Sequence, residues 1–455
     1  MRAFVEPLQE LSEYGQMVKT ADGNTGLISI TGCIDSQKPH MMYAFGNGQK
    51  NKLIVTFNEQ KAKELYEEYR FFDPDTVYYP AKDVLFYQSD IRGNVLTAER
   101  INAIKAIREQ ERVTLVTTFD ALMNTMPPAE KTWSGIIRLA PGDIIDIDEF
   151  KKKLVELGYE KDYQVETRGQ FAIRGGIIDI FPLTEENPAR IELWDDEIDT
   201  IRSFDTESQK SIENLDELVI YPACELVLTE AEKAAGIKKI TEEAEKLSDK
   251  LRKEMKTEEA YRIKSTADEL AEEWGVLQIT AGMDAFLSYF CKEKVGLLDY
   301  FPPDNTYVLF DEISRCAERG KQTETEFSES MKQRLAMGYI LPGQMKELFL
   351  EKEVMGKLAK YSCVSLSALD TKSAGLHQTG QYGIHVQSVS SYNNSFELLI
   401  KDLKKYKKNG YRVILMSGSK TRARRLAEDL MDEGFASFYT DDYDHELVAG
   451  QIMVC

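Results

Sequence analysis

The chain has 455 residues, of which 42% are hydrophobic and 29% are charged, and its formal net charge is −20. This length is too great for one ordinary core and predicts about three or four domains of a globular protein. The acidic balance argues against a protein that mainly clamps nucleic acid, because clustered Lys and Arg bind phosphate backbones. Six scattered cysteines and four histidines form no zinc-ligand pattern. The sequence has no signal-type start and no apolar run of roughly 20 residues, so we expect a cytoplasmic protein without a membrane partner.

The first unit, residues 1–125, predicts an α/β domain because strand-like runs alternate with helical ones. Such alternation is typical of a parallel sheet covered by helices. Thr97 has the side chain of a helix cap and is expected to begin the second helix. Expected strands lie at 26–30, 52–57, 76–80 and 113–118, and expected helices at 59–70 and 97–110.

Residues 126–215 predict a second domain, a β-rich α+β insert. Ile191 and Leu193 alternate with Glu192 and Trp194, which indicates strands with one solvated face. A short helix is expected at 147–157, and the basic run at 151–153 is expected to be a solvated part of it.

Residues 216–350 return to an α/β pattern and are expected to complete the first domain, which the β-rich insert thus interrupts. Residues 355–455 predict a further small α/β domain, whose basic runs are expected to be solvated helix ends. The last apolar run reads as a strand that is cut short, so we expect a piece of a longer protein. Expected elements are a helical region at 229–274, strands at 274–280, 306–312, 363–369, 383–389, 411–419 and 451–455, and helices at 395–408 and 420–433.

The stretch "GCIDSQKP" has the frame of a phosphate-binding loop, G-x-x-x-x-G-K-[ST], but with two changes. Gln37 replaces the second glycine, and Pro39 replaces the hydroxyl residue that ligates Mg²⁺. Pro39 also lacks an amide hydrogen and is expected to oppose a helical conformation at Lys38. Lys38 alone cannot position a triphosphate. The match starting at Gly32 is either an altered nucleotide loop or a coincidence.

An acidic pair, Asp311 and Glu312, ends the apolar run "VLFDE". This is the usual form of the motif that holds Mg²⁺ and activates water in nucleotide hydrolases, although acids also follow strands for structural reasons. No Ser/His/Asp or paired-carboxylate arrangement of a hydrolase is recognisable.

The β-rich segment 169–211 places Arg174, Arg190 and Trp194 among its strands. Arg and Trp dominate hot spots of protein–protein interfaces because they combine a large area with directed hydrogen bonds. The alternative is that each is an ordinary surface residue of a strand.

The motif "RGGIIDIFP", followed by "RIELWDDEIDTIRSFDTESQ", resembles domain 2 of the excision-repair protein UvrB and of the transcription-repair coupling factors. Residues 20–345 resemble the N-terminal part of the coupling factors, including "YYPAKDVLFYQSDIRGNVLTAERINAI", and the rest resembles their small third domain. UvrB keeps an intact "GKT" loop and has an aromatic hairpin that probes damaged DNA. Here only about ten residues separate Tyr87 from the next helix.

This resemblance implies a non-catalytic module that binds the damage-recognition protein UvrA. Arg174, Arg190 and Trp194 match the positions of the family's UvrA contacts, and the acids at 195–197 supply electrostatic complementarity. No cofactor is then expected for this chain. The resemblance makes the nucleotide loop non-functional, with Gly32, Gln37, Lys38, Pro39, Asp311 and Glu312 as its remnants.

The resemblance also implies features of the longer protein. ATP and Mg²⁺ serve a downstream motor that translocates on double-stranded DNA and displaces RNA polymerase, to which a further downstream domain binds. A C-terminal domain covers the UvrA-binding surface of domain 2 until the polymerase is engaged. Two alternatives stay open: an active UvrB-like ATPase that verifies lesions, and an unrelated α/β protein with chance matches.

Overall fold

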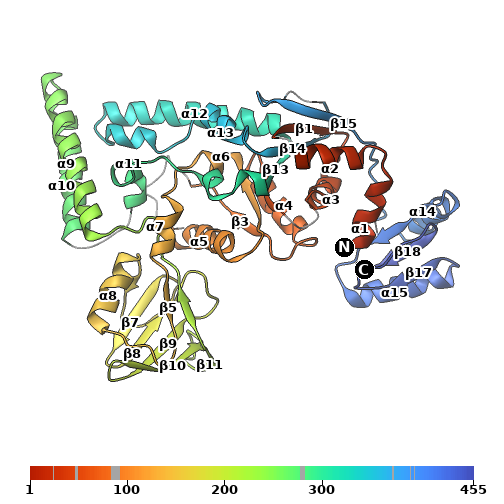
Figure 1. Ribbon diagram of the computed structural model, residues 1–455, viewed down its shortest axis with the longest axis horizontal. Coiled ribbons are helices and arrows are strands. Elements are labelled where there is room, and N and C mark those ends of the chain that lie inside the picture. The colour runs from red at the N-terminus through yellow and green to blue at the C-terminus, as the bar shows by residue number, and fades with distance from the viewer. Residues whose placement is uncertain are drawn as a thin grey trace.

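Figure 1 shows a computed structural model in which an α/β body lies between a β-rich domain and a small domain. The chain's two ends lie near each other, where the small domain meets the body. The described residues are 1–23, 25–46, 50–82, 93–276, 282–370, 373–389, 391–393 and 395–455.

The body is built on a seven-stranded parallel sheet with the order β15-β1-β14-β13-β2-β4-β3. Its strands come from both sides of the β-rich insert in the sequence, as the predicted fold class requires. Central strands are near-continuous apolar runs because both faces of a parallel sheet are covered. The strands are β1 (Gly26–Thr31), β2 (Asn51–Thr56), β3 (Val77–Tyr79), β4 (Thr114–Thr118), β13 (Thr306–Asp311), β14 (Ser362–Ser367) and β15 (Gln378–Gly383).

Two apolar cores lie on opposite faces of this sheet. Leu53 and Phe310 belong to the core that also contains α5 and α12 residues, whereas Ile54 and Leu309 belong to the core with α2, α3 and α4. The alternation along each strand therefore sends neighbouring side chains to different helical layers. The helices are α2 (Tyr14–Gly23), α3 (Lys38–Ala44), α4 (Glu59–Tyr69), α5 (Gly93–Glu109), α6 (Phe119–Met123), α7 (Ala129–Ser134), α12 (Ile313–Ala336) and α13 (Glu351–Leu358).

The β-rich domain contains a six-stranded sheet with the order β11-β10-β9-β8-β7-β6. One face packs its apolar side chains against α8, and a two-stranded ribbon of β5 and β12 leads to the body. The elements are β5 (Ile137–Leu139), α8 (Ile147–Glu156), β6 (Glu160–Lys161), β7 (Gln170–Arg174), β8 (Ile177–Ile180), β9 (Ala189–Trp194), β10 (Glu197–Phe204), β11 (Ser211–Asn214) and β12 (Leu218–Ile220).

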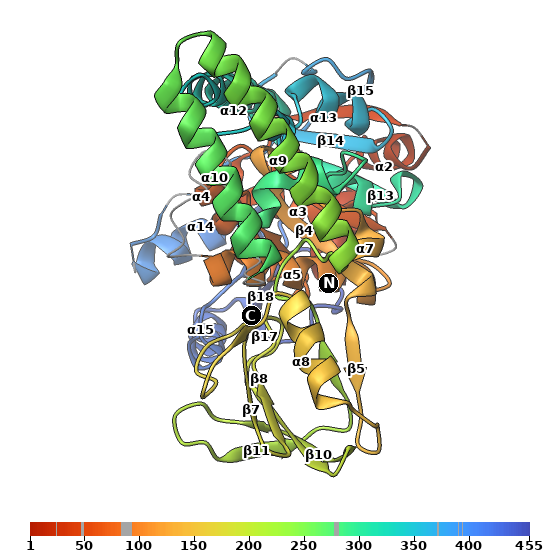
Figure 2. The ribbon, with the colours of Figure 1, turned by 90° about the vertical axis from the view of Figure 1, so that its left-hand side faces the viewer.

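A long helical hairpin projects from the body, as the Lys/Glu-rich region predicts (Figure 2). Its first helix begins with a capping box of Thr229 and Glu232, which pairs the free amides of the first turn. The elements around it are α9 (Glu230–Lys253), α10 (Thr257–Gly275), α11 (Leu287–Phe290) and the 3-10 helices η3 (Met283–Phe286), η4 (Leu297–Tyr300), η5 (Pro303–Asn305) and η6 (Pro342–Lys346).

The small domain has a three-stranded parallel sheet with the order β16-β18-β17. One face packs under α14 and α15, and the other packs on the N-terminal helix α1 through Phe4, Ile414 and Met453. The small domain consists of α14 (Phe396–Lys408), β16 (Val413–Leu415), α15 (Lys420–Asp432), β17 (Ala436–Tyr439) and β18 (Gln451–Val454). The remaining elements belong to the N-terminal part of the chain: α1 (Arg2–Val5), η1 (Glu6–Glu10) and, between β1 and α3 of the body, η2 (Asp35–Gln37).

The structure corrects two of the predicted domain limits. β14 and β15 lie after residue 355, where the small domain was expected to start, yet both pair with β1 in the seven-stranded sheet. The run at 363–369 combines apolar and small side chains, which suits any buried parallel strand and does not reveal which sheet it joins. Similarly, β12 pairs with β5 of the β-rich insert although it follows residue 215.

Three local predictions also differ from the structure. Thr97 lies inside α5 and does not cap it. Trp274 lies in the last turn of α10 rather than beginning a strand, and 277–281 lies outside the described residues. The strand expected at 383–389 is found earlier, as β15. Among the described residues, none of the helices combines the length and the apolar character needed to cross a membrane.

Candidate functional site

The altered phosphate loop connects β1 to α3, the place that such loops take in nucleotide-binding folds. Lys38 is the first residue of α3 and is helical, with φ −55° and ψ −47°. The expectation that Pro39 opposes this conformation is therefore wrong. Amides in the first turn of a helix have no partner within the helix, so a proline there breaks no hydrogen bond.

Lys38 crosses to the end of β13 and binds a group of carboxylates there. Its Nζ donates to Asp311 Oδ1 at 2.6 Å, to Asp35 Oδ1 at 2.9 Å and to Glu312 Oε1 at 3.2 Å. Thr56 Oγ1 donates to the other oxygen of Asp311 at 3.0 Å. An ammonium has three donors, so these three contacts use all of them. The structure thus brings the loop lysine and the acidic pair together, as a closed ion cluster.

Burial and the neighbouring carboxylates have opposite effects on the pKa of Lys38. Lys38 is only 2% exposed, and burial alone would lower the pKa of its ammonium. The carboxylates of Asp311, Asp35 and Glu312 outweigh burial, so the pKa of Lys38 is raised. The hydrogen bond from Lys38 in turn lowers the pKa of Asp35. The ammonium therefore stays charged and occupies the position between three acids where a bound cation would otherwise lie.

The first glycine of the loop is also covered by protein. Gly32 has φ +86°, and a Cβ added to it would lie 2.0 Å from the carbonyl oxygen of Ile384. This segment is held in place because Ile384 N donates to Thr31 O at 2.9 Å. A carbonyl oxygen this close leaves no room for a phosphate group on that side of Gly32.

The residues of the loop thus fit a magnesium triphosphate poorly. Pro39 offers no hydroxyl to Mg²⁺, Lys38 is held by the chain's own acids, and Ile384 lies against Gly32. Gln37, which replaces the second glycine, has a buried side-chain oxygen for which the described residues offer no hydrogen-bond donor. The loop's geometry is that of a strand–turn–helix scaffold.

The second candidate is the outer face of the β-rich sheet. Arg190 and Trp194 are four residues apart on β9, so their side chains project from the same face of the sheet. Asp179 of β8 lies directly opposite Arg190 and therefore shares this face. Arg174 ends β7 beside them. Trp194 closes β9 and is 82% exposed, next to the turn in which Asp195 has φ 61°.

Asp179 joins the two arginines. Its carboxylate is 1% exposed and accepts from Arg190 Nε at 2.6 Å and Arg190 Nη2 at 2.9 Å, and it also accepts from Arg174 Nη2. The Arg190 guanidinium lies 4.5 Å from the centre of the Phe204 ring and donates to Gln209 Oε1 at 2.9 Å. The hydrogen bond with Asp179 raises the pKa of Arg190. Two guanidinium groups share one carboxylate, so the cluster keeps a positive charge for an acceptor on a partner.

Sequence reasoning found the arginines and the tryptophan but missed the acids that organise both places. Asp179 is the one charged residue in the apolar run "IIDIF", and such an acid in a buried strand needs a cationic partner. Asp35 lies inside the loop motif, three residues before Lys38. The stretch expected between Tyr87 and the next helix, residues 88–97, lies partly outside the described residues, and α5 already begins within it at Gly93.

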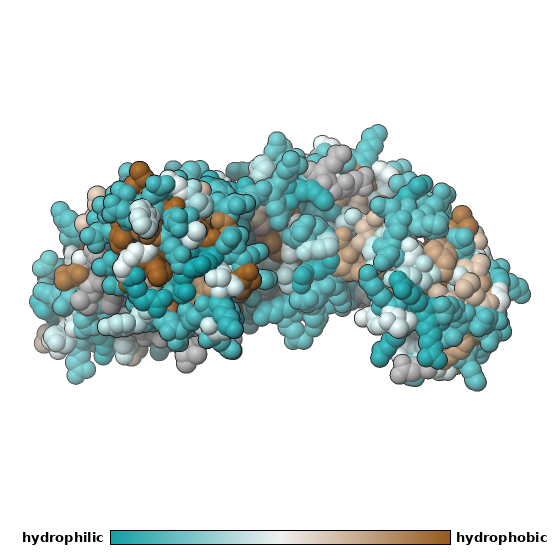
Figure 3. All heavy atoms as spheres, turned by 90° about the horizontal axis from the view of Figure 1, so that it is seen from below, coloured by the Kyte–Doolittle hydropathy of each residue, from teal (hydrophilic) through white to brown (hydrophobic). Residues whose placement is uncertain are grey.

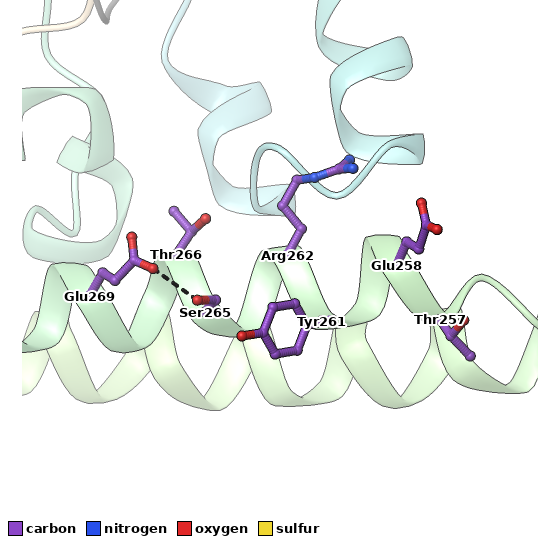
Figure 4. Close-up of a pocket in the computed structure, with 7 residues that line it drawn as sticks. All are labelled: Thr257, Glu258, Tyr261, Arg262, Ser265, Thr266 and Glu269. Atoms are coloured by element: carbon purple, nitrogen blue, oxygen red, sulfur yellow. Dashed lines mark hydrogen bonds between the residues drawn. The ribbon is translucent and has the colours of Figure 1, made fainter.

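A shallow hollow of about 550 Å³ along α10 lies away from both candidates (Figure 4). Its polar groups come from this one helix, and Ser265 Oγ donates to Glu269 Oε1 at 2.8 Å. The Arg262 guanidinium is used within the fold, since it donates to Met337 O and lies over the Tyr339 ring. We assign no function to this hollow.

Comparison with known proteins identifies the β-rich insert and the relatives of the chain. Residues 137–226 match the family described as the UvrB interaction domain. The chain is 30% identical over 406 residues to the transcription-repair-coupling factor of Bacillus subtilis, covering 88% of this chain and 34% of that protein. It is 26% identical over 441 residues to that of Staphylococcus haemolyticus, covering 94% of this chain and 36% of that protein.

UvrABC system protein B of Thermosipho africanus is also similar, with 28% identity over 420 residues that cover 86% of this chain and 63% of that protein. The chain spans about a third of the length of the coupling factors that it matches. The chain is thus similar to transcription-repair-coupling factors over most of its length, and its β-rich insert matches the UvrB interaction domain.

Proposed function

We propose that this chain is a non-catalytic, UvrB-like docking module that recruits UvrA in transcription-coupled nucleotide excision repair. The observation that carries the proposal is the cluster of Arg174, Asp179 and Arg190 with the exposed Trp194 beside it. The cluster lies within residues 137–226, the segment that matches the UvrB interaction domain.

The cluster has the properties of an interface hot spot. Asp179 and the Phe204 ring hold Arg190 in one orientation, so little side-chain freedom is lost when a partner binds. Trp194 adds a large, rigid and exposed apolar surface on the same face. A partner that offers a carboxylate to the arginines and a pocket to the tryptophan fits this face.

The non-catalytic part of the proposal rests on the altered loop. Lys38 is engaged with Asp311, Asp35 and Glu312, and the residue after it is a proline, which has no hydroxyl. Phosphoryl transfer depends on positioning the phosphates and the metal, and these residues supply neither role. We therefore propose that this chain needs no nucleotide or metal cofactor.

The longer relatives suggest what this module serves. We propose that regions outside the aligned third bind RNA polymerase and double-stranded DNA and use ATP and Mg²⁺ to translocate and displace a stalled polymerase. A C-terminal domain that covers the outer face of the β-rich sheet would make recruitment of UvrA conditional on engagement of the polymerase. The module then couples the stalled polymerase to repair.

Isothermal titration calorimetry of the chain with purified UvrA tests the docking proposal. We expect measurable binding by the unaltered chain and at least about tenfold weaker binding by Arg190→Ala and Trp194→Ala, since hot-spot truncations cost about 2 kcal/mol or more. Arg174→Ala is expected to weaken binding less, because its guanidinium is the more exposed of the two. Tyr163→Ala is the matched control, since Tyr163 is 93% exposed in the same domain. Equal affinity of all these variants would remove this face from the interface.

A second candidate function is an active UvrB-like ATPase. The similarity to UvrABC system protein B and the retained pair of Asp311 and Glu312 favour it. Steady-state ATP hydrolysis by the chain, measured with and without damaged duplex DNA, decides between the two. Turnover that disappears in Lys38→Ala would establish this candidate, whereas background rates in both proteins support the docking module.

A further inference from the structure

The outer end of the β-rich sheet carries an additional short strand segment. Ile144 forms an antiparallel bridge with Glu197, the first residue of β10. Two hydrogen bonds fix this pairing: Ile145 N donates to Asp196 O, and Ile198 N donates to Asp143 O, each at 2.8 Å. The segment before α8 thereby extends the sheet at the end where β9 turns into β10.

Three exposed side chains lie in one row at this end. Trp194 pairs with Glu197 across the hairpin, and Ile144 faces Glu197 from the other side. Residues directly opposite one another in a sheet project from the same face. Trp194 is 82% exposed and Ile144 is 75% exposed, so two large apolar side chains stand in water on either side of a glutamate. The row continues the face that carries Arg190, four residues before Trp194 on β9.

Acidic side chains surround this row. Asp195, Asp196 and Glu197 form the hairpin end, and Asp143 lies beside them in the added segment. Within the described residues, Asp195, Asp196 and Glu197 have no ion-pair partner. The face therefore has two poles: a cationic cluster around Asp179 and an anionic end around the exposed apolar pair. Seen from below, the β-rich end shows separate brown groups set among teal ones (Figure 3).

We propose that Ile144, Trp194 and the acids around them form a second half of the docking face, which takes an apolar pocket of the partner framed by Lys and Arg. The proposal rests on the proposed function and specifies the chemistry of UvrA's surface at this end. An apolar contact inside a ring of opposite charges excludes water at the centre and uses the charges for orientation and rate of encounter. The two poles together also fix the direction in which the partner docks.

Titration of UvrA onto variants of this end tests the proposal by calorimetry and stopped-flow association. We expect Ile144→Ala to weaken binding at least about fivefold, as for a hot-spot neighbour of Trp194. Glu197→Lys is expected to slow association and to reduce its dependence on salt. Both side chains are exposed, so the fold is expected to persist, and circular dichroism verifies it. Tyr163→Ala, beside the edge strand β6 and separated from β9 by β7 and β8, is expected to bind normally.

The outcomes separate the two proposals. If Ile144→Ala and Glu197→Lys bind and associate like the unaltered chain while Arg190→Ala binds weakly, the anionic end lies outside the interface and this inference is overturned. If the unaltered chain does not bind UvrA, the proposed function and this inference fall together. Weaker binding by Ile144→Ala with slower association by Glu197→Lys supports the inference.

Discussion

Replacing Lys38 with methionine tests whether its ammonium holds the altered loop together. Methionine keeps most of the apolar length of the side chain but removes the charge that three carboxylates share. Buried Asp311 then keeps a hydrogen bond from Thr56 and loses the cation 2.6 Å away. Removing one partner of a buried ion pair costs about 3–5 kcal/mol, so we expect the free energy of unfolding of the body to fall by that amount near neutral pH.

The loss of unfolding free energy in Lys38→Met is expected to depend on pH. The raised pKa of Lys38 means that its contribution is complete below the ordinary lysine value and is lost only as pH rises through the raised value. The lowered pKa of Asp35 means that its contribution is present above the ordinary aspartate value and is lost as pH falls through the lowered one. The deficit of Lys38→Met should therefore hold from about pH 5 to about pH 9 and shrink as pH falls below about 4, where Asp35 becomes protonated.

Urea unfolding followed by circular dichroism measures this deficit, and hydrogen exchange of α3 and β13 amides assigns it to the loop. Lys61→Met is the matched control. Lys61 is 22% exposed and lies 3.4 Å from Asp35 and 3.6 Å from Glu64, so its loss should cost less than about 1 kcal/mol. If Lys38→Met unfolds within about 1 kcal/mol of the unaltered chain at every pH, the cluster does not stabilise the loop as argued.

Four further predictions follow from other contacts. Arg100 Nε lies 2.6 Å from Glu225, both buried, so Arg100→Met should lose about 3–5 kcal/mol in urea unfolding; a loss below about 1 kcal/mol would contradict this. Burial opposes ionisation of Glu225 but Arg100 and Lys82 bring its pKa to about 2, so stability should fall with pH below about 4.5, and less steeply in Glu225→Gln. Asp179→Asn should weaken UvrA binding about tenfold in calorimetry, because an amide cannot pair two guanidinium groups; unchanged affinity would refute it. Gly32→Ala should lower the melting temperature more than Gly142→Ala, since both have positive φ but only Gly32 meets a carbonyl oxygen; equal shifts would refute the clash.

Local patterns in the sequence predicted much of the fold. The runs at 26–30, 52–57 and 113–118 became β1, β2 and β4 within a residue or two, because buried parallel strands are short apolar runs between turns. The alternation of Ile191 and Leu193 with Glu192 and Trp194 correctly assigned opposite faces of β9. The ends of helices and strands were predicted less accurately: Thr97 has a capping side chain, but α5 begins before it, at Gly93.

For the candidate sites too, the sequence revealed some features and left others hidden. Residue chemistry alone identified the missing hydroxyl at Pro39 and the aromatic side chain at Trp194. It did not reveal that Lys38 pairs with Asp311, 273 residues away, or that Asp179 joins two arginines from neighbouring strands. Such contacts depend on which strands become neighbours, and no local period encodes that choice.

The sequence by itself determined which side chains were available: a loop lacking its magnesium ligand, and arginines and a tryptophan on strands with a solvated face. Only the tertiary structure decided that β14 enters the middle of the first sheet and that Ile144 stands in one row with Trp194. Periodicity and turn chemistry act over a few residues and can be read along the chain. Strand order and buried ion pairs are set by packing summed over the whole fold, where distant segments compete for the same neighbours.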